Sequence, residues 1–233
     1  MIFPIGDTQI QGGRTPLFTY AFLAANVLVF LYQVQLSQPA LLDFMNDYAT
    51  RPAVVARGAG YHTLLTSMFL HGSWMHLIGN MLFLWVFADN IEAVVGNWRF
   101  LLFYLLGGLA AWFGHFYFNA ESQLPAVGAS GAISAVLGAY LVMFPKSRIR
   151  TLFFLFVFEV PALLFLLFWF GQQAVSGYGS LQVATEQTAG VAWWAHIGGF
   201  LFGVLAGFYF RGRHRDDAPF RYAQQVPNRP RVG

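Results

Sequence analysis

Residues 130–144 read Ser-Gly-Ala-Ile-Ser-Ala-Val-Leu-Gly-Ala-Tyr-Leu-Val-Met-Phe, a run without a single charged side chain. Its many small residues make a poor lipid-facing helix, but they allow backbones to approach closely inside a helix bundle. We therefore expect this stretch to form a short helix at the centre of a bundle. The apolar segments on either side of it should supply the surrounding helices.

Six segments, this one included, are candidates for crossing a membrane. A spanning helix needs about 20 mostly apolar residues at a rise of 1.5 Å per residue. Because proline suits the first turn of a helix, the fifth candidate has an alternative start at Pro161, with Leu152–Phe158 along the membrane interface. The candidates are Leu17–Leu36, Trp74–Ile91, Phe100–Phe118, Ser130–Phe144, Leu152–Phe170 and Val191–Phe210.

The composition supports a membrane protein. Of the 233 residues, 57% are apolar and only 10% are charged, whereas a soluble domain has about 25% charged residues. We expect an all-α membrane protein with six transmembrane helices in residues 17–210. Residues 1–16 would form a cytoplasmic N-terminal segment without a removable signal peptide, and residues 211–233 a basic cytoplasmic tail.

The basic residues predict the orientation of the helices. Lys146, Arg148 and Arg150 follow the fourth segment and several arginines follow the sixth, while the loops after the third and fifth carry only Glu121 and Glu186. Since cytoplasmic loops are enriched in Lys and Arg, both termini should be cytoplasmic. The basic residues are scattered and lack an aromatic platform, which favours contact with the lipid bilayer over nucleic-acid binding. The compact chain favours a bacterial inner membrane.

Three polar clusters interrupt the apolar segments. Residues 71–80 read His-Gly-Ser-Trp-Met-His-Leu-Ile-Gly-Asn, residues 128–131 read Gly-Ala-Ser-Gly, and residues 195–199 read Ala-His-Ile-Gly-Gly. Polar groups within spans are costly and are candidates for function. The second, fourth and sixth helices would run in the same direction, so His76, Asn80, Ser130 and His196 should all lie near the outer level.

This set of groups fits acyl transfer. A serine is a weak nucleophile unless a base takes its proton, and His196 can serve Ser130 in that way. The oxyanion that forms needs donors already in place, and His76 and Asn80 share a helix face four residues apart. The backbone N–H of Ser130 at a helix start is a third donor. No Asp or Glu lies within two turns of His196 in the sequence, so a Ser–His dyad is expected, with a triad that includes Glu121 of the third loop as the alternative.

Glycines and a further histidine should shape this site. Gly128 and Gly131 remove side chains where backbone and substrate must come close. His71 precedes the expected N-cap Ser73, and we interpret it as a loop anchor beside the site. A separate repeat of small residues predicts a packing face against the central helix, and it consists of Gly199, Gly203 and Gly207.

At these residues the chain resembles the rhomboid family of intramembrane serine proteases, over roughly residues 60–210. The family patterns HGxxxHLxxN, GxSG and AHxxG match residues 71–80, 128–131 and 195–199, in this order. The resemblance implies a six-helix rhomboid-like bundle with Ser130 as nucleophile and His196 as general base. It also implies an oxyanion hole of His76, Asn80 and the Ser130 amide. Substrates would be transmembrane segments of other proteins, and no metal or cofactor is implied.

The chain departs from the family in one place near the base. Many members have an aromatic residue four positions after the serine, where it packs on the histidine, but here that residue is Ser134. Another side chain must then orient His196, and Trp193 and Trp194 are candidates.

Two other functions compete with the protease. One is a non-catalytic rhomboid-like protein that binds membrane helices, although such relatives usually lose the serine or the histidine. The other is a metal-dependent enzyme or transporter built on His71, His76 and His196, for which the sequence lacks an HExxH pair.

Overall fold

The computed structural model describes residues 2–8, 10, 13–182, 192–218 and 220. Most of the expected basic tail, residues 221–233, and Glu186 of the fifth loop lie outside the described residues. The described part is mostly helical, as the sequence predicts.

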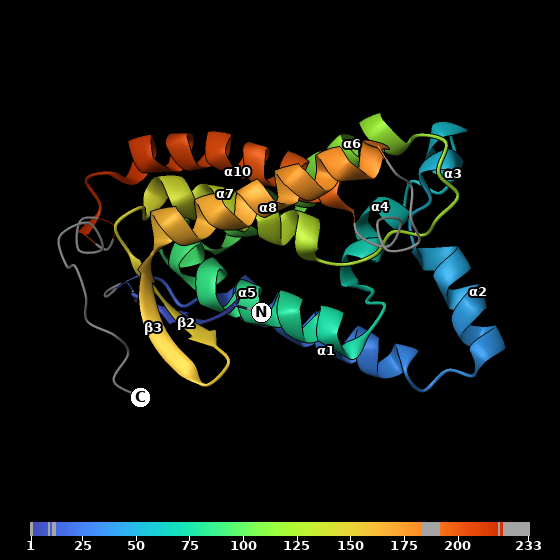
Figure 1. Ribbon diagram of the computed structural model, residues 1–233, viewed down its shortest axis with the longest axis horizontal. Helices are drawn as coiled ribbons and strands as arrows, with labels where there is room; N and C mark the ends of the chain where they lie inside the picture. The colour runs from blue at the N-terminus through green and yellow to red at the C-terminus, as the bar shows by residue number, and fades with distance from the viewer. Residues whose placement is uncertain (1, 9, 11–12, 183–191, 219, 221–233) are drawn as a thin grey trace.

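Six long helices lie side by side along the longest axis of the molecule, with short helices at one end and a small sheet at the other (Figure 1). Five of them begin or end within a few residues of the predicted segments. Within the described residues they are α1 (Leu17–Gln33), α5 (Trp74–Val95), α6 (Asn97–Asn119), α7 (Ser130–Met143), α8 (Ala162–Gln182) and α10 (Trp193–His214).

Three of these helices, α5, α6 and α10, are long and apolar enough to cross a membrane by length and composition. The apolar helices α1 and α7 are shorter, with 17 and 14 residues. In α8 two glutamines, Gln172 and Gln173, interrupt the apolar sequence. The count of six spans therefore stays a prediction, while the helical membrane bundle is confirmed.

Helix α7 forms the core of this bundle. Twelve of its fourteen residues are buried, and its neighbours include α5, α6, α8 and α10. At 1.5 Å per residue, fourteen residues span about 21 Å, less than the thickness of the hydrocarbon layer. Since α7 begins only at Ser130, the chain before it descends into the bundle as a loop, which is tolerated where protein surrounds it.

The glycine face predicted for the last helix packs on α7. A Cβ at Gly203 or at Gly199 would overlap the carbonyl oxygen of Ala135 or of Gly131, and one at Gly207 would lie 3.0 Å from Ala139 Cα. Glycine therefore lets α10 approach the α7 backbone directly. This contact sets the spacing between the two helices that carry Ser130 and His196.

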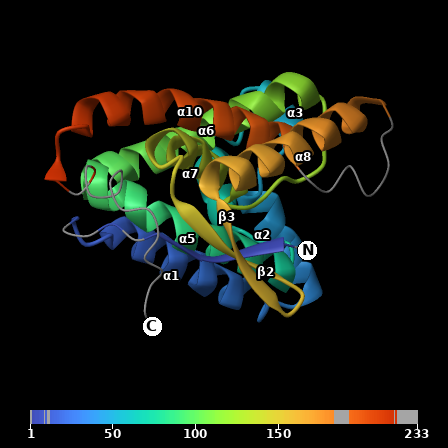
Figure 2. The same cartoon turned by 60° about the vertical axis from the view of Figure 1, so that its left-hand side comes forward.

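A three-stranded antiparallel sheet, in the order β1-β2-β3, is the main difference from the all-helical prediction. Its strands are β1 (Ile2–Asp7), β2 (Arg148–Phe153) and β3 (Phe156–Pro161). A continuous fifth span from Leu152 is thus wrong, and the alternative start at Pro161 is close, because α8 begins at Ala162. The β-branched and aromatic residues of 149–160 favour a strand over a helix. Figure 2 shows the β2–β3 hairpin projecting from the bundle beside α8.

The long connection between α1 and α5 folds into short elements at the end opposite the sheet (Figure 1). They are α2 (Gln38–Tyr48), α3 (Pro52–Ala56), α4 (Thr63–Thr66) and the 3-10 turn η1 (Ser67–Phe69). Thr50 pairs with Ala126 in an isolated bridge, and the Gly128 N–H donates to the Ser67 carbonyl at 2.8 Å. The first loop therefore holds the segment that leads into Ser130.

Candidate active site

Ser130 and His196 contact each other at the start of their helices. Ser130 is the first residue of α7, and His196 is the fourth residue of α10. The Ser130 Oγ lies 2.9 Å from His196 Nε2, which is hydrogen-bond distance. The two residues are 66 positions apart in the chain, so the contact depends entirely on the packing of α7 against α10.

The other ring nitrogen of His196 contacts a residue that we did not predict. His196 Nδ1 lies 2.7 Å from Oε1 of Gln173 in α8, and only 7% of Gln173 is exposed. The predicted fifth segment ends at Phe170, so Gln173 lies beyond it in the sequence. A glutamine in an apolar helix is the signal that marks such a residue.

Two aromatic rings flank the His196 imidazole. The ring of Trp193 meets it edge-on at 6.1 Å between centroids, and the ring of Trp169 lies 6.0 Å away. Trp193 is thus placed beside His196 as expected, whereas Trp194 stacks on Phe118 at 3.7 Å instead. Ser134, at the position where the family has an aromatic residue, donates its hydroxyl to the Ser130 carbonyl at 2.6 Å.

His76 and Asn80 lie over Gly128. A Cβ at Gly128 would sit 2.7 Å from His76 Nε2 and 3.5 Å from Asn80 Nδ2, so glycine keeps open a space that both nitrogens face. Gly128 has φ +121°, a conformation that side-chain-bearing residues rarely adopt. His76 is the third and Asn80 the seventh residue of α5, whose N-terminus is capped by the Ser73 hydroxyl accepting from the His76 N–H.

His71 is held firmly in the loop before α5. Its backbone N–H donates to Gln33 Oε1 at 3.1 Å, and its carbonyl accepts from Gln33 Nε2 at 3.2 Å. The His71 ring nitrogen Nε2 lies 2.8 Å from Asn80 Nδ2. Burial, and secondarily the nearby His76, lower the pKa of His71 to about 4. His71 is therefore neutral near pH 7 and touches the candidate donor Asn80 directly.

A small cavity of about 30 Å³ lies next to Ser130. Gly128, Gly131 and His115 are among its lining residues. Gly131 also meets α6, since a Cβ there would lie 2.6 Å from Ala111 Cβ. We expected Gly131 to allow a substrate to approach closely. Its contact with α6 shows that it also allows two helices to pack closely.

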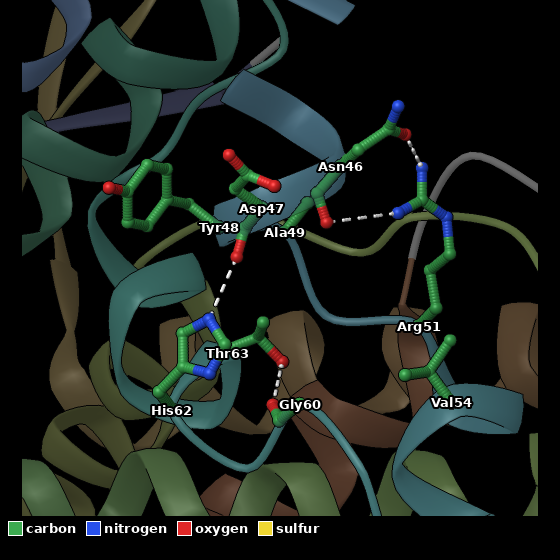
Figure 3. A pocket seen from close by; sticks show the side chains of 9 residues that line it. All are labelled: Asn46, Asp47, Tyr48, Ala49, Arg51, Val54, Gly60, His62 and Thr63. Atoms are coloured by element: carbon green, nitrogen blue, oxygen red, sulfur yellow. Dashed lines mark hydrogen bonds between the residues drawn. The ribbon is translucent and has the colours of Figure 1, made fainter. Parts of the chain in front are cut away.

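A larger pocket of about 380 Å³ lies in the first loop (Figure 3). Its polar groups bind one another: Arg51 donates to the Asn46 side chain at 2.6 Å, and His62 Nε2 lies 2.9 Å from the Asp47 carbonyl. None of the predicted site residues lines this pocket.

The histidines do not gather into a metal-binding group in the described part of the chain. There, no set of three or more His, Cys, Asp or Glu side chains is placed to hold a metal ion. Of the three histidines of the metal hypothesis, His71 pairs with Asn80 and His196 with Ser130, while the His76 ring lies 5.0 Å from the His71 ring.

Comparison with known sequences identifies one family. The Rhomboid domain matches residues 58–213. Rhomboid protein 1, mitochondrial, of Saccharomyces cerevisiae is 31% identical over 203 residues, which cover 82% of this chain and 52% of the yeast protein.

Two further relatives carry the rhomboid name and share sequence with this chain. Rhomboid protease GluP of Bacillus subtilis is 35% identical over 139 residues, covering 59% of this chain and 26% of GluP. The human presenilin-associated rhomboid-like protein, mitochondrial, is 30% identical over 192 residues, covering 78% of this chain and 45% of the human protein. This chain thus spans about half the length, or less, of the relatives it matches.

Proposed function

The chain belongs to the rhomboid family, and we propose that it is an intramembrane serine endopeptidase that cleaves transmembrane segments of other membrane proteins. Ser130 is the nucleophile and His196 the general base of this proposal. The observation that carries it is the 2.9 Å contact between Ser130 Oγ and His196 Nε2. The name of the relative GluP, which calls it a rhomboid protease, agrees with this activity.

The first chemical step follows from this contact. As Ser130 Oγ attacks the peptide carbonyl, its proton passes to His196 Nε2, and the carbonyl oxygen becomes an oxyanion. The same imidazole then gives the proton to the leaving amine. In the second half of the reaction, His196 takes a proton from the water that attacks the acyl-enzyme and returns it to Ser130 Oγ.

The oxyanion is assigned to the space above Gly128. Donors are needed where negative charge develops, about 2.7–3.1 Å from the oxyanion. His76 Nε2, Asn80 Nδ2 and the backbone N–H of Ser130 are the three candidates, and the open position at Gly128 lies 2.7 Å from the first and 3.5 Å from the second. The Ser130 amide is at the first position of α7, where helix amides have no intrahelical partner.

The location is a membrane, with the chain crossing it several times. We place the sheet end, with Arg148 and Arg150, on the cytoplasmic side and the first loop on the other, from the basic residues. The expected bacterial inner membrane has no support from the yeast and human relatives, whose names place them in mitochondria.

Cleavage of a test transmembrane substrate in proteoliposomes tests this function. Wild type and Ser130→Ala are compared side by side, with the folded state of both checked by thermal unfolding. We expect wild type to cut and Ser130→Ala to bind substrate without cutting. Failure of both to cut several substrates would favour the non-catalytic binding protein. Equal cutting by both would reject Ser130 as the nucleophile.

A further inference from the structure

The partner of His196 Nδ1 bears on how the base works, and it extends the function proposed above. A neutral imidazole carries one proton, and it can accept the serine proton at Nε2 only if Nδ1 holds its own proton. Ser–His enzymes often fix this tautomer with a third group bound to Nδ1. Here that nitrogen lies 2.7 Å from Gln173 Oε1.

The orientation of the Gln173 amide follows from its second contact. Gln173 Nε2 lies 3.4 Å from the carbonyl oxygen of Trp169, one turn earlier in α8. A carbonyl only accepts, so the amide atom facing it must be the nitrogen, and the oxygen must then face His196. An oxygen at that place can only accept, which requires the proton of His196 to be on Nδ1. Nε2 is then free to accept from the Ser130 hydroxyl at 2.9 Å.

One face of α8 supplies this arrangement. Trp169, Gln173 and Gly177 are spaced four residues apart and share that face. Trp169 lies beside the His196 ring, and a Cβ at Gly177 would lie 3.1 Å from Ile197 of α10. This face of α8 therefore packs against α10 at the level of His196. Ser134 donates its hydroxyl to the Ser130 carbonyl, whereas Gln173 and Trp169 of α8 and Trp193 of α10 lie against the His196 ring.

We infer that Gln173 is a positioning residue of the active site, which holds His196 in the tautomer that can accept the Ser130 proton. During attack the proton moves from Ser130 Oγ to His196 Nε2, and the imidazolium keeps its Nδ1 proton bonded to Gln173 Oε1. The amide stabilises that imidazolium without placing a carboxylate inside the bundle. Burying a carboxylate carries a large desolvation cost, which is larger still in a membrane interior.

The test compares Gln173→Leu with the neighbouring Gln172→Leu. Both glutamines line the same groove along α8, but Gln172 is exposed and Gln173 is buried. Two readouts are used: kcat and KM for cleavage in proteoliposomes, and the rate at which a fluorophosphonate labels Ser130. Labelling reports the reactivity of the serine without a bound substrate helix, which a purely structural effect on substrate binding does not change.

Gln173→Leu is expected to lower kcat and the labelling rate roughly 10- to 100-fold with little change in KM, because a hydrogen bond to a group that becomes charged is lost. Gln172→Leu should behave as wild type. Gln173→Asn is one methylene too short to reach His196 and should be as slow as Gln173→Leu.

Three outcomes overturn the inference: wild-type rates in Gln173→Leu, equal losses in the two leucine variants, or Gln173→Asn as fast as wild type. If wild type labels and cuts while Ser130→Ala does neither, these outcomes reject only the role of Gln173. If Ser130→Ala matches wild type, the proposed function itself fails, whatever Gln173 does.

Discussion

Gly203 of α10 lies directly on Ala135 of α7, so close that a Cβ at Gly203 would overlap the Ala135 carbonyl oxygen. The same face of α10 carries His196, two turns earlier, and the same helix α7 begins at Ser130. The distance between these two helices therefore controls the distance between the hydroxyl and the imidazole.

Gly203→Ala is expected to push α10 away from α7 and to lower both stability and cleavage. Overpacking of a tight contact costs about 1–3 kcal/mol, and a small shift of His196 weakens its bond to Ser130. Thermal unfolding and cleavage rates measure the two effects. Gly212→Ala is the matched control, because a Cβ at Gly212 on the same helix would meet nothing within 4 Å. Equal melting temperatures for the two variants would contradict the packing argument.

Gly128→Ala should abolish cleavage while the protein still folds. The new Cβ would occupy the space facing His76 Nε2 and Asn80 Nδ2, and φ +121° at this residue strains any side chain. The fluorophosphonate labelling rate and kcat should both fall. Gly72→Ala, where a Cβ meets nothing within 4 Å, serves as the control. Full activity in Gly128→Ala would show that the oxyanion does not lie there.

Asn80→Ala is expected to lower kcat about 10²- to 10³-fold, the cost of removing one oxyanion donor. KM should change little, because the interaction forms mainly in the transition state. Asn26→Ala provides a comparison, because Asn26 is another buried asparagine in a helix. Its side-chain Nδ2 donates to the Phe22 carbonyl within α1. An unchanged kcat in Asn80→Ala would remove Asn80 from the oxyanion hole.

Stability should depend on pH through His71. Its pKa is about 4 in the folded protein, because of burial and the nearby His76, and about 6.5 when unfolded. The unfolded chain therefore binds a proton first as pH falls, so stability is complete above pH 6.5 and declines toward pH 4. The loss from this group between pH 7 and pH 5 is about 2 kcal/mol.

The free energy of unfolding of the solubilised protein, compared between pH 7 and pH 5, measures this loss of stability. His71→Gln should remove this contribution and so make the loss of stability on acidification smaller than in wild type. His62→Gln, at an exposed histidine of the first loop, should leave the wild-type dependence intact. If all three proteins lose the same stability on acidification, His71 is not the group responsible.

Glu92 stabilises the start of α1 from within α5. The side chain is fully buried, and its carboxylate accepts from the backbone N–H groups of Phe18 and Thr19 and from the Thr19 hydroxyl at 2.7–2.8 Å. Glu92→Gln loses the charge and one acceptor oxygen, and should cost about 1–3 kcal/mol. Glu159→Gln, at an exposed carboxylate of β3, should cost far less. Similar unfolding free energies for the two variants would argue against a stabilising role of the Glu92 carboxylate at the start of α1.

The sequence alone determined the membrane class and five of the helix positions, and it predicted the set of candidate site residues. Those features depend on local composition: long apolar runs, a stretch of small residues at 130–144, and polar groups such as His196 that are costly in a membrane. The repeat of glycines on α10 likewise predicted its packing on α7, because the spacing of four residues places them on one face.

Only the tertiary structure decided what surrounds the reactive residues. Residues 148–161 form the hairpin of β2 and β3, and β1 pairs with β2 from a distant part of the chain, which local sequence cannot reveal. Gln173 meets His196, and His71 meets Asn80, because contacts across 23 and 9 residues depend on how whole helices and loops pack. Periodicity predicts which face a residue occupies, whereas its partner is set by the packing of the other helices.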